Sequence, residues 1–356
     1  MKRRWILITC SLILALIVVA GGWFYYQSTQ PLYKPGMVSR GENLSAPLEP
    51  PRQPEGSAVW LVEPGIELAH FTEGAGRDVL VLHGGPGQPF VESPPGMEAL
   101  ADRFRFHYYD QRGSGDSTRP VERFEPGNLY QNMVALDRSL GIGAQIADIE
   151  RVRRILGGQK LILMGHSWGG FLASLYAAEF PDNVEALILV APANTLVMPQ
   201  PDAESDLFAS VGANLPPEKR AEFDQFMDEY LDFRGLFGKS EDELVEMNNQ
   251  FGEYYLEATG EMPSEEGKQP GGWMVWAQYV SMGQRHDYRP SLVRVGAPVL
   301  VLHGARDMQS ESASRLYAEA FPNSTFVTIP DSSHTPFIDN PREFAIALSE
   351  FLDNLP

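Results

Sequence analysis

The sequence predicts an α/β fold, in which a mostly parallel central sheet carries helices on both faces and a helical cap is inserted between two blocks of strands. The strands are indicated by short apolar runs, which fall into one block before Pro192 and another after Ala297. Between the blocks the sequence becomes acidic, aromatic and rich in methionine, with a helical pattern such as Glu222–Leu231. The breaks in this middle region fall at proline and glycine residues, which typically end helices.

The length agrees with one α/β domain that carries an insertion, because 356 residues exceed a single ordinary core. We expect the chain to divide into an N-terminal membrane anchor or signal segment (1–29), a proline-rich linker (30–56), the first part of the α/β core (57–192), a helical cap (193–290) and the second part of the core (291–356). The prolines of the linker predict a semi-rigid tether.

Ser167 is the candidate nucleophile. It lies in a Gly-x-Ser-x-Gly pattern, Gly165–Gly169, between the apolar run 160–164 and the helical pattern 170–179. A strand that turns sharply into a helix holds such a serine in a strained conformation with its hydroxyl exposed. The glycines are expected because strand and helix approach closely there, and the helix amino terminus favours the negative charge that develops in acyl transfer. The alternative is an inert serine in a glycine-rich turn.

The base and the acid that a nucleophilic serine needs are expected later in the chain, in the order serine, acid, histidine. Asp307 follows the apolar run 297–304, and His334 follows the next run, 324–330. Both positions are at carboxyl ends of strands, where catalytic groups of open α/β sheets collect. Asp331 and Asp339 are rival acids, but they are close to the histidine in sequence rather than on the preceding strand.

The predicted oxyanion hole has two backbone donors. One is the amide of Trp168, the residue after the nucleophile. The other is the amide of Gly85 in the glycine-rich loop His83–Gly87, which follows the apolar run 79–82. A phosphate site in this loop is disfavoured, since no Gly-Lys-Ser/Thr follows and no spaced Gly-x-Gly-x-x-Gly is present.

Four motifs together resemble the proline iminopeptidase group of the α/β-hydrolases. They are His83–Gly87, Asp110–Ser117, Ala147–Arg153 and Gly165–Gly170. The resemblance extends from about Ala58 to the end of the chain and is weakest between residues 194 and 290.

This resemblance implies an α/β-hydrolase fold and a serine peptidase that removes an amino-terminal residue, often proline. It implies the roles given above for Ser167, Asp307, His334, Gly85 and Trp168, whereas Asp110 and Arg112 would brace the loops beside the site. Family members recognise the free substrate amine with acidic side chains of the cap. Here the candidates for that role are Glu204, Glu229, Glu253 and Glu257, which the sequence does not rank. The tryptophan pair Trp273 and Trp276 is followed by Ala277 where the resemblance implies a glutamate, so the substrate-binding residues stay unassigned.

Three functions stay open at this stage. The first is a serine aminopeptidase of proline iminopeptidase type, acting on a peptide. The second is an esterase or amide hydrolase that uses the same triad on a small ester or amide. The third is a non-catalytic binding protein with a hydrolase-like fold. Relatives that use an aspartate nucleophile are excluded by Ser167 itself.

The N-terminal sequence predicts export. Lys2–Arg4 precedes an uncharged run, Trp5–Tyr26, which is long enough to span a bilayer as a helix at ~1.5 Å per residue. Its last residues, Trp23–Tyr26, resemble an interfacial aromatic belt, and the basic end is expected to stay in the cytoplasm. A signal peptide cleaved before Gly21, which gives a secreted or periplasmic enzyme, is the alternative.

Composition narrows the partners further. The formal charge of −19 argues against binding to nucleic acid and to anionic lipid. No cluster of histidine, cysteine and carboxylate residues has metal-ligand spacing, so we expect no metal and no cofactor. The single cysteine, Cys10, lies in the apolar run and has no second cysteine with which to form an intramolecular disulfide.

Overall fold

The computed structural model describes residues 26, 29–125, 127–201, 206–260 and 267–355. The predicted anchor or signal segment, 1–29, therefore lies outside the described residues, apart from Tyr26 and Thr29. Among the residues that are described, no helix is long and apolar enough to cross a membrane.

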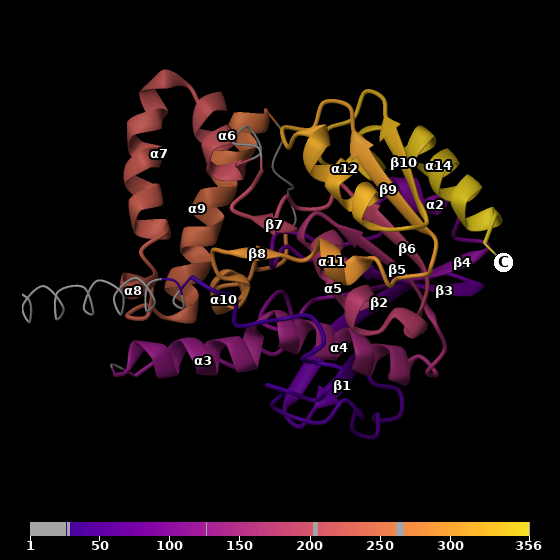
Figure 1. Cartoon of the computed structure of the whole chain (residues 1–356), viewed down its shortest axis with the longest axis horizontal. Helices are drawn as coiled ribbons and strands as arrows, with labels where there is room; N and C mark the ends of the chain where they lie inside the picture. Colours follow the sequence, from indigo (N-terminus) through magenta and orange to yellow (C-terminus); the bar gives the residue numbers. More distant parts are fainter. Residues whose placement is uncertain (1–25, 27–28, 126, 202–205, 261–266, 356) are drawn as a thin grey trace, which may run out of the picture.

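The centre of the molecule is an eight-stranded sheet (Figure 1). In spatial order its strands are β1 (Val59–Glu63), β2 (Ile66–Gly74), β4 (Phe104–Tyr109), β3 (Arg77–Leu82), β5 (Leu161–His166), β6 (Val184–Val190), β9 (Val299–Gly304) and β10 (Ser324–Ile329). The strands from β4 to β10 are parallel, whereas β1 and β2 form an antiparallel edge. Because the strands are mostly parallel, the loops that leave β3, β5, β9 and β10 emerge at one edge of the sheet.

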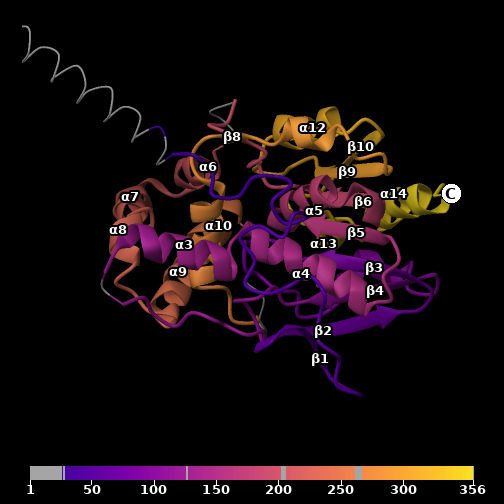
Figure 2. The same cartoon turned by 60° about the horizontal axis from the view of Figure 1, so that its bottom comes forward.

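Helices cover both faces of this sheet (Figure 2). Those outside the cap are α2 (Pro95–Glu98), α3 (Leu129–Leu140), α4 (Ile142–Ile155), α5 (Trp168–Glu179), α11 (Arg289–Leu292), α12 (Glu311–Ala320), α13 (Pro336–Asp339) and α14 (Pro341–Asp353), with a 3-10 turn at Pro181–Asn183. Helices α4, α5 and α12 share one apolar core with the sheet, and α2, α13 and α14 share another. Alternate residues of β3 point to the two faces, with Leu80 and Leu82 in the first core and Val79 and Val81 in the second. The predicted fold class is therefore confirmed.

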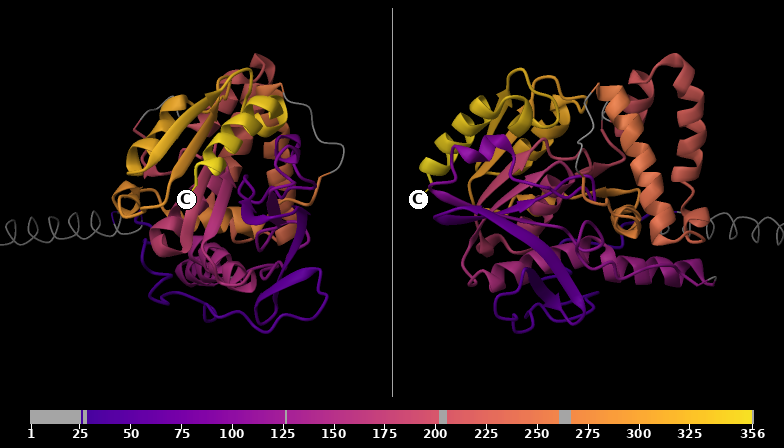
Figure 3. Two further views of the ribbon diagram at one scale, coloured as in Figure 1. Left: turned by 90° about the vertical axis from the view of Figure 1, so that its right-hand side faces the viewer. Right: turned by 180° about the vertical axis from the view of Figure 1, so that it is seen from behind.

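The helical cap lies between β6 and β9 in the sequence and stands to one side of the sheet (Figures 1 and 3). It comprises α6 (Leu207–Asn214), α7 (Pro217–Tyr230), α8 (Phe233–Leu236), α9 (Glu241–Thr259) and α10 (Trp273–Met282), with the short strands β7 (Val197–Met198) and β8 (His286–Asp287) at its base. Its apolar core includes Tyr230, Trp273 and Trp276, and it continues into Leu136 and Leu140 of α3. The aromatic residues of the cap are therefore largely packing residues.

The segment predicted as a tether packs against the catalytic core. Tyr33 and Val38 are buried, and the carboxylate of Glu179, at the end of α5, anchors this stretch. Glu179 accepts hydrogen bonds from the Tyr33 hydroxyl at 3.0 Å, from the Gly36 amide at 2.7 Å and from the Ser39 amide at 3.0 Å. The proline pattern indicates the lack of regular structure but gives no signal for this docking, which depends on one distant carboxylate.

Candidate active site

Ser167 occupies the turn between β5 and α5 in a conformation that favours glycine, with φ 52° and ψ −119°. The turn is held by neighbouring backbone: the Ser167 amide donates to Val190 O at 2.9 Å, and the Ala193 amide donates to Ser167 O at 3.0 Å. The end of β6 and the loop after it therefore fix the backbone of the candidate nucleophile. This is the strained strand-to-helix turn that the sequence predicts.

The glycines around Ser167 are required by close packing. A Cβ on Gly165 would collide with the carbonyl of Gly169, and a Cβ on Gly169 would collide with the carbonyl of Leu82. A Cβ on Gly84 would lie 2.9 Å from Cβ of Ser167 itself. The loop after β3 therefore lies directly against the serine, as an oxyanion loop must.

His334 and Asp307 meet at the same edge of the sheet. Nδ1 of His334 is 2.9 Å from Oδ2 of Asp307, and the Asp307 side chain is almost fully buried. Burial on its own raises the pKa of Asp307, but the nearby His334 and the hydrogen bonds to the carboxylate outweigh it and leave that pKa below its usual value. An ionised aspartate on Nδ1 leaves Nε2 as the nitrogen that can exchange a proton with a serine.

The two rival acids lie on the same segment as His334, and one of them, Asp339, is bound by Ser333. Oδ2 of Asp339 accepts hydrogen bonds from the Ser333 amide at 2.7 Å and from the Ser333 hydroxyl at 2.6 Å. Asp331 lies in the turn after β10 with φ 53°. The carboxylate beside the His334 imidazole is therefore the one on the preceding strand end.

Two residues that the sequence did not single out hold this pair in place. The amide of Gln309 donates to Oδ1 of Asp307 at 2.9 Å, and its side chain accepts from the Asn194 amide and donates to the Pro192 carbonyl. His166 bonds through Nε2 to the carbonyl of His334 at 2.8 Å. Since Nε2 must carry the proton in that bond, His166 acts as a fixed neutral donor.

The loop His83–Gly87 is held in place by Gln111 of the second glycine-rich motif, Asp110–Ser117. The amide of Gln111 donates to Nε2 of His83 at 3.0 Å, and its side chain donates to the His83 carbonyl at 2.9 Å. Nδ1 of His83 lies 3.0 Å from the carbonyl of Gly84 and therefore carries the proton. Gly85, the predicted oxyanion donor, follows with φ +112°, which a glycine tolerates.

Arg112 holds its own loop, which follows β4, through a buried ion network. Its guanidinium binds both carboxylate oxygens of Asp148 and one oxygen of Glu63, and Arg151 bonds to the same two acids. All four side chains are at most 6% exposed, so each charge depends on the others for compensation. The network ties β1 and α4 to the loop after β4, which matches the bracing role expected of Arg112.

Burial lowers the pKa of His83 to about 4 and that of His166 to about 3. Between pH 6.5 and 4 the unfolded chain gains protons on these histidines while the folded chain does not. The free energy of unfolding is therefore expected to fall as the pH is lowered through this range, by roughly 3 kcal/mol from His83 alone. Urea unfolding of the wild type and of His83→Gln at pH 7 and pH 4.5 checks this, and equal pH dependence in the two proteins would contradict it.

The cap acids considered for binding a substrate amine are mostly occupied or exposed. Glu229 pairs with Lys239, and Glu257 pairs with Lys219, each at 2.7 Å. Glu253 is exposed, and Glu204 lies outside the described residues. In the described part of the cap, none of these carboxylates forms a hydrogen bond or an ion pair with the Ser167 turn.

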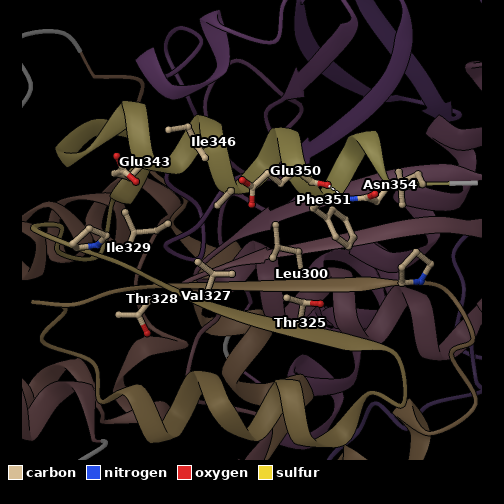
Figure 4. Close-up of a pocket in the computed structure, with 14 residues that line it drawn as sticks. Leu300, Thr325, Val327, Thr328, Ile329, Glu343, Ile346, Glu350, Phe351 and Asn354 are labelled. Carbon is tan, nitrogen blue, oxygen red and sulfur yellow. Dashed lines mark hydrogen bonds between the residues drawn. The ribbon is translucent and has the colours of Figure 1, made fainter.

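A groove of about 530 Å³ lies elsewhere, between the edge strand β10 and helix α14 (Figure 4). Leu300, Val327, Ile346 and Phe351 contribute apolar side chains to it. Ser167, Asp307 and His334 are not among its lining residues. The groove is therefore separate from the candidate reaction site.

The fold and this arrangement of loops define a class of protein. Residues 79–341 match the alpha/beta hydrolase fold family, and the chain belongs to that family. It is 25% identical over 309 residues to a proline iminopeptidase of Heyndrickxia coagulans, covering 82% of this chain and 96% of the relative. It is 27% identical over 285 residues to a pimeloyl-[acyl-carrier protein] methyl ester esterase of Chromobacterium violaceum, covering 79% and 96%.

A solved structure agrees with the fold. The crystal structure of a proline iminopeptidase from Mycobacterium smegmatis superposes with a TM-score of 0.54 at 20% identity, covering 81% of this chain and 95% of that one. The resemblance to proline iminopeptidases is thus confirmed at the level of family and fold, and it is shared with esterases.

Proposed function

We propose that the chain is a serine hydrolase that cleaves an acyl bond with Ser167, His334 and Asp307. The observation that carries this proposal is the 2.9 Å contact between His334 Nδ1 and Asp307 Oδ2, at the same sheet edge as the strained Ser167 turn. A buried carboxylate on the far nitrogen of an imidazole is the arrangement that prepares a histidine to act as a general base.

In the proposed reaction Ser167 Oγ attacks the carbonyl carbon of the substrate while Nε2 of His334 takes the hydroxyl proton. Asp307 stabilises the imidazolium that forms and keeps its orientation. The amides of Gly85 and Trp168 donate to the oxyanion of the tetrahedral intermediate. His334 then returns the proton to the leaving group, and water repeats the sequence in reverse to release the acid and restore Ser167.

Within this class we propose an aminopeptidase of proline iminopeptidase type. The support is the resemblance of the His83–Gly87, Asp110–Ser117 and Gly165–Gly170 motifs to that group, together with the H. coagulans relative. Such an enzyme must pair the ammonium group of its substrate with a carboxylate in a low-dielectric pocket, because an unpaired buried charge is costly.

An esterase is the second candidate, and the cap provides the observation that favours it. Glu229 and Glu257, two of the acids proposed to bind an amine, already pair with lysines. The relative from C. violaceum is described as a methyl ester esterase, and an esterase needs the same triad without an amine site.

Acetylation of the substrate amine separates the two candidates. For an aminopeptidase, kcat/KM for an N-acetylated aminoacyl nitroanilide should be on the order of 10²-fold lower than for the free amine, which corresponds to ~3 kcal/mol of lost charge pairing. The measurement is the ratio of kcat/KM for the two substrates, with 4-nitrophenyl butyrate as the ester reference. Equal or faster cleavage of the acetylated substrate, or a clear preference for the ester, would assign an esterase.

We also propose that the N-terminal run anchors the enzyme with its catalytic domain outside the cytoplasm. The support is the sequence of residues 2–26, with basic residues first and aromatic residues last. Fractionation of cells with the protein in the membrane pellet is the expected result. A mature soluble protein whose first residue is Gly21 would show a cleaved signal peptide instead.

A further inference from the structure

One segment of the cap, Lys268–Gly272, contacts both glycine-rich loops of the core. The amide of Gly271 donates to the carbonyl of Gly87 at 2.9 Å, at the end of the candidate oxyanion loop. The amide of Gly115, in the second glycine-rich motif, donates to the carbonyl of Gln269 at 2.9 Å. The segment therefore joins two core loops that are distant from it in sequence.

This segment and the start of α10 pack closely against both core loops. A Cβ on Gly87 would lie 2.9 Å from the amide nitrogen of Gly271, and a Cβ on Gly113 would lie 2.7 Å from Cβ of Met274. The Gly271 carbonyl is held from the other side, since Nδ2 of Asn248 donates to it at 2.6 Å. A displacement of this segment would thus be transmitted directly to Gly87.

An ion pair also holds this segment on the core, next to the hydrogen bonds from Arg119 to the carbonyls of Gln269 and Pro270. Nζ of Lys268 lies 2.8 Å and 2.9 Å from the two carboxylate oxygens of Asp110, whose side chain is only 2% exposed. Burial raises the pKa of Asp110, and Lys268 opposes that shift. Asp110 directly precedes Gln111, whose amide and side chain hold His83 at the other end of the oxyanion loop.

We propose that Lys268 is a positioning residue, which holds the cap segment against the oxyanion loop by pairing with Asp110. The two ends of that loop are then fixed by one connected structure, with Gln111 on His83 and Gly271 on Gly87. This inference rests on the proposed serine hydrolase function, because that function makes Gly85 of this loop an oxyanion donor.

The proposal predicts a loss in kcat rather than in substrate binding. A misplaced oxyanion donor weakens binding of the tetrahedral intermediate, where the charge develops, more than binding of the neutral substrate. Direct removal of a donor typically costs ~10²–10³-fold in kcat, so an indirect shift of the loop is expected to cost about tenfold. A purely structural role would instead lower the melting temperature without this selective effect.

The test uses three variants of the full chain: Lys268→Met, Asp110→Asn and the double variant. Each single variant should lower kcat for 4-nitrophenyl butyrate about tenfold with KM nearly unchanged. Since both break the same contact, the double variant should be no slower than the slower single variant. The rate of phosphonylation by a fluorophosphonate should fall in parallel. Arg123→Met, which removes an exposed ion pair with Glu243 of the cap, is the control and should leave kcat unchanged.

The outcomes separate this inference from the proposed function. An unchanged kcat in Lys268→Met, a change confined to KM or to the melting temperature, or losses that multiply in the double variant would overturn the positioning role. If the wild type hydrolyses the ester and Ser167→Ala does not, the serine hydrolase function stands whatever Lys268 does. If the wild type is neither active nor phosphonylated, the proposed function fails, and the positioning role fails with it.

Discussion

Replacing Ser167 with alanine is expected to lower kcat by about 10⁶-fold, because the nucleophile of a triad cannot be substituted by its neighbours. The fold should persist. The backbone of residue 167 is held by Val190 and Ala193 rather than by its own side chain, although alanine must adopt the same positive φ. The measurement is kcat for 4-nitrophenyl butyrate and for an aminoacyl nitroanilide, together with the melting temperature.

A matched control is Ser349→Ala on α14, whose hydroxyl accepts from Arg103 and donates to Asp353 at the surface. It should retain the wild-type kcat. If the Ser167→Ala protein kept more than a few per cent of wild-type turnover with a normal melting temperature, Ser167 would not be the nucleophile.

Replacing Asp307 with asparagine is expected to lower kcat by about 10⁴-fold. Asparagine keeps the size of the side chain, but its amide can donate to Nδ1 of His334. The proton is then placed on Nε2, the nitrogen that must accept it from Ser167. The pH dependence of kcat/KM, measured with the same ester, should no longer show the ionisation of the His334–Asp307 pair.

The rival acids provide the controls for Asp307. Asp339→Asn should lose far less activity, since its carboxylate bonds to Ser333 and not to the imidazole. A larger loss in Asp339→Asn or Asp331→Asn than in Asp307→Asn would reassign the acid of the triad.

The sequence was sufficient for the parts of the site that depend on local pattern. A strand followed by Gly-x-Ser-x-Gly and a helix leaves few possible conformations, so the turn at Ser167 could be predicted together with its glycines. Asp307 and His334 could be placed because each directly follows an apolar strand run, and parallel strands bring such ends to one edge. The antiparallel edge of β1 and β2 had no comparable signal in the sequence.

Contacts between distant segments were not predictable in the same way. Gln309 and Lys268 are unremarkable polar residues in sequence, and only the fold brings them to Pro192 and Asp110. The docking of Tyr33 onto Glu179 is similar, because nothing local marks either residue.

The most direct measurement of the central proposal is the site at which a fluorophosphonate attaches to the protein. Such a reagent reacts with a serine that is activated by a neighbouring base and faces an oxyanion hole. Mass spectrometry of the digested protein should find one adduct, on the peptide that contains Ser167, and the adduct should be absent in His334→Ala. An unlabelled wild-type protein, or an adduct on any other residue, would contradict the assignment of Ser167, His334 and Asp307 as the catalytic triad.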